Sequence, residues 1–147
     1  MTVTHMYEEI RDALKAQIES GLASEGEATT DVYITNYQNI PMFPAITLQV
    51  ERRRKVKRAA NRVRQLEFDL SVWVYVKLYD AEDAERECLR ITEIVEAAIE
   101  SDKTLNGTAH YLTIDDNLEF GTVATGNDGD VFLQGARIQL TITKRFQ

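Results

Sequence analysis

The sequence contains few of the residues that most often form chemical sites in proteins. It has one cysteine, Cys88, and two histidines, His5 and His110, among its 147 residues. A single cysteine excludes an internal disulfide and cannot form a thiolate metal site alone, so we expect Cys88 to pack in a core. The two histidines are too few and too separated for a metal cluster, and we expect both at the surface.

Membrane and export signals are also missing from the sequence. No stretch approaches the ~18 consecutive apolar residues that cross a bilayer. The first residues show no progression from a basic to an apolar to a small-residue region. We therefore expect a soluble chain of the cytosolic type.

Motifs for catalysis are absent as well. No glycine-rich phosphate loop of either common pattern occurs. The carboxylates of Asp115-Asp116 and Asp128-Gly129-Asp130 lack the spacing of a calcium loop that ends in glutamate, so we expect turns there. The sequence predicts a protein that is not an enzyme, with no catalytic, cofactor-binding or metal-binding residue.

Positive charge is present, but it is concentrated in one short window, residues 52–64. Eight of the seventeen Lys and Arg residues lie there without an intervening Asp or Glu. Subtracting these eight charges from the formal net charge of −7 leaves about −15 for the rest of the chain. Such separation of sign favours a role in contacting partners. The cationic residues are Arg52, Arg53, Arg54, Lys55, Lys57, Arg58, Arg62 and Arg64.

This basic window lies between two stretches of alternating hydrophobicity. Apolar residues recur with period two from Ile46 to Val50 before it, and from Leu66 to Val76 after it. The pattern predicts a long β-hairpin with the window as its tip and upper arms. Trp73, Tyr75 and Tyr79 alternate on the less apolar side, which is either covered by the chain or forms a surface between subunits.

Two amphipathic helices are predicted. Between Thr4 and Gly21 apolar residues recur every four positions, and either Gly21 or the Ser24-Glu25-Gly26 run ends this helix. A second helix runs from an Asp80 N-cap to about Glu100. It has an apolar stripe and an acidic outer face formed by Glu85, Glu93, Glu96 and Glu100.

The remaining segments complete a sheet. We expect a short strand at 31–37, a second strand pair or a single long strand at 111–123, a turn at 125–130 and a final strand at 131–145. The order is α-β-β-β-α-β-β. It predicts one domain, residues 1–147, with an α+β two-layer sandwich: a mostly antiparallel sheet, a long hairpin and both helices on one face.

Several short phrases accompany this order: Phe43-Pro44-Ala45-Ile46 at the start of a strand, the Asp80 helix start, Asp102-Lys103-Thr104-Leu105-Asn106-Gly107, and Ala136-Arg137-Ile138-Gln139-Leu140. Together, over essentially the whole chain, they resemble the tail terminator (tail completion) proteins of long-tailed bacteriophages. Related neck proteins share similar phrases. In the fold, Pro44 would fix the start of a strand and Gly107 would supply a positive φ.

The resemblance implies a structural virion protein of a phage or prophage, assembled in the bacterial cytoplasm. Such proteins form a ring, usually a hexamer, on the head-proximal end of the tail tube, where they end polymerisation and present a surface for head joining. The implied partners are other copies of the chain, the major tail tube protein and a head-side neck or connector protein. DNA would at most pass through the ring, and no membrane and no cofactor are implied.

A ring needs contacts between unlike surfaces of neighbouring subunits. We expect the basic hairpin to reach an acidic surface, either Glu85, Glu93 and Glu96 of the adjacent copy or the tail tube protein. One alternative is a solvated hairpin that only balances charge. The others are a different neck adaptor, such as a head-closure or tail-completion protein, and a nucleic-acid-binding module that uses the hairpin.

Overall fold

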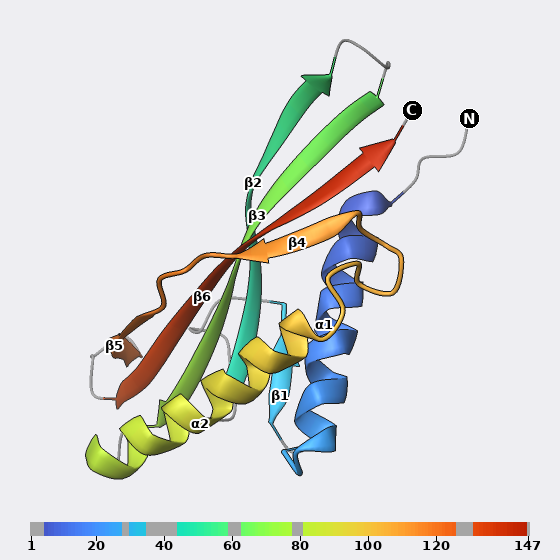
Figure 1. Ribbon diagram of the computed structural model, residues 1–147. Helices are drawn as coiled ribbons and strands as arrows, with labels where there is room; N and C mark the ends of the chain where they lie inside the picture. Colours follow the sequence, from blue (N-terminus) through green and yellow to red (C-terminus); the bar gives the residue numbers. More distant parts are fainter. Residues whose placement is uncertain are drawn as a thin grey trace.

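The computed structural model describes residues 5–27, 30–34, 44–58, 63–77, 81–125 and 131–146. In chain order these form helix α1 (Met6–Ser24), strands β1 (Asp31–Tyr33), β2 (Ala45–Arg58) and β3 (Val63–Lys77), helix α2 (Ala81–Glu100), and strands β4 (Tyr111–Ile114), β5 (Glu119–Thr125) and β6 (Val131–Phe146). Figure 1 shows the two helices lying along one side of a strongly twisted sheet. The predicted α+β sandwich is confirmed.

The sheet has the strand order β1-β2-β3-β6-β4, and β5 also pairs with β6. Among the described strands, β1 and β2 form a parallel pair and the other pairs are antiparallel. The segment 111–123, predicted as one strand or two, contains parts of two strands. Both lie on the same edge of β6, with β5 opposite residues 131–137 and β4 opposite residues 140–143.

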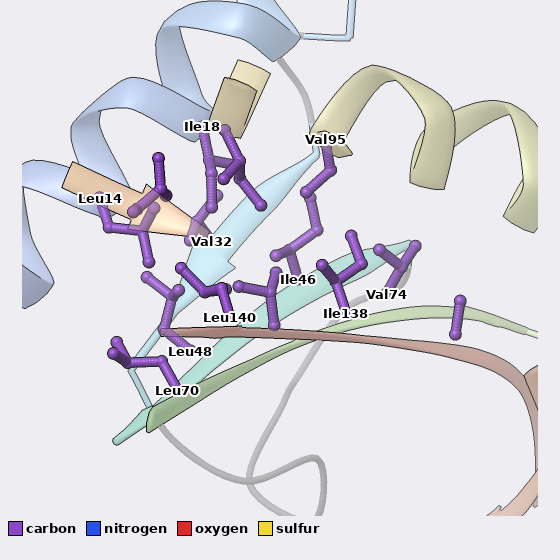
Figure 2. Close-up of a cluster of buried hydrophobic side chains, with 14 of the residues drawn as sticks. Leu14, Ile18, Val32, Ile46, Leu48, Leu70, Val74, Val95, Ile138 and Leu140 are labelled. Carbon is purple, nitrogen blue, oxygen red and sulfur yellow. The ribbon is translucent and has the colours of Figure 1, made fainter. Parts of the chain in front are cut away.

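The core lies between the helices and the sheet. Each helix buries one apolar stripe, as predicted from the spacing of its apolar residues. The stripe of α1 consists of Ile10, Leu14, Ile18 and Leu22, and that of α2 of Ala84, Cys88, Ile91, Val95, Ala98 and Ile99. Figure 2 shows side chains of both helices meeting Ile46, Val74 and Ile138 of three neighbouring strands.

Helix α1 ends at Ser24, so the second of the two predicted stop signals operates. Gly26 adopts the left-handed conformation with φ of 77°, which glycine allows without a steric penalty. Gly21 lies inside the helix and faces α2. A Cβ atom on Gly21 would lie 2.4 Å from the Cβ atom of Ala98. Gly21 therefore permits the close approach of the two helices.

We expect Gly21→Ala to lower the free energy of unfolding by about 1–2 kcal/mol, because overpacking outweighs the gain in helix propensity. Chemical denaturation measures the change. Ser20→Ala, an exposed neighbour in the same helix, is the matched control and should stay within about 0.5 kcal/mol of the wild type. Adding Ala98→Gly to Gly21→Ala should relieve the clash, and strictly additive effects in this cycle would contradict the predicted contact.

The C-terminal end of α2 is held by a side chain of α1. The two N–H groups of the Gln17 amide are shared among the carbonyl oxygens of Ala98, Ile99 and Asp102, at N···O distances of 2.9, 2.9 and 3.0 Å. Carbonyl groups at a helix end lack partners within the helix, so this amide satisfies them and fixes the two helices together.

The turn after α2 uses the phrase Asp102–Gly107. The carboxylate of Asp102 accepts hydrogen bonds from Thr104 and from the backbone N–H of Asn106, and these bonds lower the pKa of Asp102 below its usual value. Gly107 has a φ of 83°, which confirms the prediction for this glycine. Leu105, also with positive φ, is fully buried beneath the turn.

Some sequence predictions fall outside the described residues. These are the Asp80 N-cap, Phe43, Tyr79 and the turn at 126–130. No helix in the described part of the chain is long and apolar enough to cross a membrane.

Candidate assembly surfaces

The predicted long hairpin is present as strands β2 and β3. Their paired residues run from Ala45 opposite Tyr75 to Arg58 opposite Val63. In Figure 1 the upper ends of β2 and β3 extend beyond both helices, with the end of β6 beside them. The basic window therefore forms an arm at one end of the molecule, and the hairpin tip at residues 59–62 lies outside the described residues.

A β-bulge decides which way the cationic side chains point. The register shifts between Val50 and Arg52, which leaves Glu51 as the extra residue. Beyond this bulge Arg52 lies opposite Asp69 and Arg53 lies opposite Phe68. Since Phe68 faces the helices, Arg53 and Lys55 share the helix side of the sheet, whereas Arg52 and Arg54 lie on the opposite face.

On the face opposite the helices, acids of β3 neutralise two of the arginines. Arg54 forms two parallel hydrogen bonds with Asp69, of 2.7 and 3.0 Å, and a third with Glu67 of 3.1 Å. Arg52 also donates to Asp69, at 3.1 Å, and so does the hydroxyl of Thr141 at 3.0 Å. The hydrogen bond to Glu67 and the charge of Asp69 raise the pKa of the Arg54 guanidinium.

Asp69→Ala should lower the free energy of unfolding by about 2 kcal/mol, because the mostly buried Asp69 carboxylate accepts hydrogen bonds from Arg54, Arg52 and Thr141. Denaturation monitored by circular dichroism measures this change. Glu67→Ala removes a single contact to Arg54 and serves as the control, with an expected loss of about 1 kcal/mol. Equal losses for the two variants would contradict the central role of Asp69.

The cations on the helix side have no such partners. Arg53 and Lys55 are exposed, and neither forms an ion pair with any described residue. The backbones of Lys57, Arg58 and Arg64 lie in β2 and β3, while Arg62 lies outside the described residues. Among the candidate residues whose side chains the structure describes, Arg52 and Arg54 form a neutralised pair, and Arg53 and Lys55 form an available pair.

The predicted acidic surface lies at the other end of the molecule. Glu85 and Glu93 on α2 are exposed, and Glu96 is half-buried. Arginines of the same helix are already paired, Arg86 with Glu82 and Arg90 with Glu27. Figure 1 shows α2 beneath the sheet at the end away from the extended hairpin. The structure therefore does not bring the basic and acidic candidate residues together within one subunit.

A polar cluster that was not predicted from the sequence lies next to Asp69, on the face opposite the helices. Arg137 donates to Glu51 at 2.7 Å and to the hydroxyl of Ser71 at 3.1 Å, and Ser71 donates to Glu51. The Arg137 guanidinium also lies 5.4 Å from the centre of the Trp73 ring. Ser71 and Arg137 each alternate with apolar residues in their own strands, but the contact between them requires knowing that β3 pairs with β6.

The aromatic residues of this face have different environments. Tyr75 is buried with Ala45 and Leu133 in a second small core, and Trp73 stacks on it at a centroid distance of 5.7 Å. Tyr75 is therefore covered by its own chain and does not form a surface between subunits. Trp73 is only partly buried.

The other candidate residues behave as ordinary structural groups. Cys88 is fully buried, and burial raises the pKa of its thiol. The carboxylate of Asp115 accepts the backbone N–H of Asn117 at 3.1 Å, which is a turn contact. Both histidines are exposed, and His110 lies against Arg145. No group of metal-binding side chains occurs among the residues that the structure describes.

A groove of about 850 Å³ lies between α1 and α2. Small side chains such as Ala13, Ser20 and Ala97 line most of it. The described residues that line it form no cluster of reactive groups.

No protein-family model matches this sequence, and a search of curated protein sequences finds no match either.

Proposed function

We propose that this protein is a tail terminator subunit of a long-tailed phage or prophage, which forms a ring that caps the head-proximal end of the tail tube. Two lines support the proposal. One is the resemblance of the element order and of the short phrases quoted above. The other is the observed α+β fold, which has that element order, with segment 111–125 forming two strands, and an extended hairpin.

The observation that carries the proposal is the placement of charge. Available cations, Arg53 and Lys55, lie on the extended arm, and exposed acids, Glu85 and Glu93, lie on helix α2, which Figure 1 shows away from that arm. Unlike surfaces on one subunit permit closed heterologous assemblies, and like surfaces repel. If copies stand side by side, every arm lies on the same rim of the ring, where it can meet the tail tube protein.

Dedicated nucleic-acid binding receives less support from the same geometry. Arg52 and Arg54 already donate to Asp69 and Glu67, so a phosphate would have to compete with these carboxylates. Phosphate binding depends on the number of available cations, and the acidic remainder of the chain opposes it.

Electron microscopy of the purified protein mixed with tail tubes tests the proposal, after measurement of its size in solution. We expect density at one end of each tube and a ring of several copies. Binding to DNA-filled heads instead of tubes would indicate another neck adaptor. A monomer at high concentration that ignores both tubes and heads would refute the proposal.

A further inference from the structure

Strand β2 has a long edge without a partner in the described part of the chain. Its other edge pairs with β3 throughout, whereas β1 covers only residues 45–47. Backbone N–H and C=O groups of alternate residues from Leu48 to Arg58 therefore face outward along this edge. An unpaired edge of this length is a template for another strand unless something prevents pairing.

A second open edge lies on the opposite side of the sheet. Among the described residues β4 pairs with β6 alone, and its Tyr111 and Thr113 are exposed. Pairing across the sheet places both edges at the same level, since one row contains Thr113, Thr141, Asp69 and Arg52. The next row contains Ile114, Leu140, Leu70 and Val50. Both rows lie beyond the end of β1.

The directions of the two edges are compatible. Each step from β2 through β3 and β6 to β4 is antiparallel, so β4 runs opposite to β2. If a second copy is placed beside the first without a shift along the strands, its β4 meets β2 in an antiparallel arrangement. Exposed Val50 then faces Ile114 on the helix side, and Arg54 faces Tyr111 on the other side.

The charges beside the two edges differ. The β2 edge carries two available cations, Arg53 and Lys55, and the two neutralised arginines, Arg52 and Arg54. Strand β4 itself contains no charged residue, and the acids that follow it, Asp115, Asp116 and Glu119, are exposed. Pairing of β2 with β2 of another copy would instead place cations beside cations, which opposes a symmetric contact.

We propose that the β2 edge of one copy pairs with the β4 edge of the next, so that neighbouring copies share one continuous sheet. The proposal rests on the proposed function, because it names the contact between copies in the ring. It assigns the contact to backbone pairing at the level of Arg52 and Thr113. The part of the arm beyond Arg54 and helix α2 then remain available at the two rims of the ring.

Disulfide cross-linking tests this register. Arg52→Cys and Thr113→Cys proteins are prepared separately, mixed and mildly oxidised, and the linked species are identified by mass spectrometry. Cys88 stays in place because it is buried. Within one subunit the two positions are three strand spacings apart, roughly 14 Å, which exceeds the ~7 Å limit for a disulfide. The link can therefore form only between copies.

The matched control is Arg53→Cys mixed with Thr113→Cys. Position 53 is the next residue of β2, but it faces the other side of the sheet. We expect the 52–113 product to exceed the 53–113 product several-fold. Equal yields, or a dominant 52–52 product, would overturn the proposal.

The outcomes also separate the two proposals. If rings form and cap tubes without the 52–113 product, the edge contact is wrong and the proposed function stands. The bulge and the charges of β2 would then serve only to prevent another strand from pairing with this edge. If the product forms but tubes stay uncapped, the edge contact stands and the proposed function is wrong. A monomer that gives no product refutes both.

Discussion

Exchanging Arg53 and Lys55 together for glutamate is expected to weaken ring assembly or tube capping on the order of a hundredfold, because like charges placed against an acidic partner cost several kcal/mol. The fold should not change. Both side chains are exposed and have no ion-pair partner among the described residues, so the free energy of unfolding should stay within about 0.5 kcal/mol of the wild type.

Sedimentation velocity measures association between copies, and counting capped tube ends by electron microscopy measures capping. A variant with Lys15 and Lys103 changed to glutamate has the same net charge, but its changes lie on α1 and in the turn after α2. It should assemble normally. Arg54 is left intact because its replacement would also break the contacts with Asp69 and Glu67. Unchanged assembly and unchanged capping would contradict a role for the arm.

Periodicity in the sequence was sufficient to predict the hairpin and both helices. Alternation from Leu66 to Val76 and the four-residue spacing from Met6 to Ile18 are local patterns, and burial of one face preserves them in the fold. The sequence pattern of segment 111–123 did not distinguish one long strand from two short ones. Its turn uses Asp115 and Asn117, whose side chains tolerate several turn geometries.

The division of the basic window into paired and available cations required the structure. Alternation counted straight through from Val50 would place Arg52 on the helix side, but the bulge at Glu51 reverses every later side chain of β2. Nothing in the local sequence marks this bulge. The neutralising acids, Glu67 and Asp69, come from a different strand, so their contacts follow from register rather than from spacing along the chain.

The role of Gly21 also could not be predicted from the sequence alone. Its position near the end of an amphipathic stretch is compatible with a helix stop, yet the glycine serves the contact with Ala98 on a helix about 80 residues later. A close approach between helices depends on tertiary packing, and a single sequence does not report it.

Phe68→Ala is expected to cause the largest loss of stability, about 3–5 kcal/mol, because it opens a cavity where the arm joins the helix layer. Phe68 is 2% exposed and is paired with Arg53 on one side and Ile142 on the other. The ring of Tyr7 from α1 meets it edge-on at a centroid distance of 5.1 Å. Chemical denaturation measures the loss.

Two further variants separate the causes of this loss. Tyr7 is half-exposed, so Tyr7→Ala should cost about 1 kcal/mol through the lost ring contact alone. Phe68→Leu keeps most of the volume and should cost less than about 1.5 kcal/mol. If the ring contact matters, the effects of Tyr7→Ala and Phe68→Ala will be less than additive in the double variant. A Phe68→Ala loss no larger than that of Tyr7→Ala would mean that the arm is not anchored at this point. Since Phe68 lies opposite Arg53, anchoring here also fixes the direction in which the available cations leave the subunit.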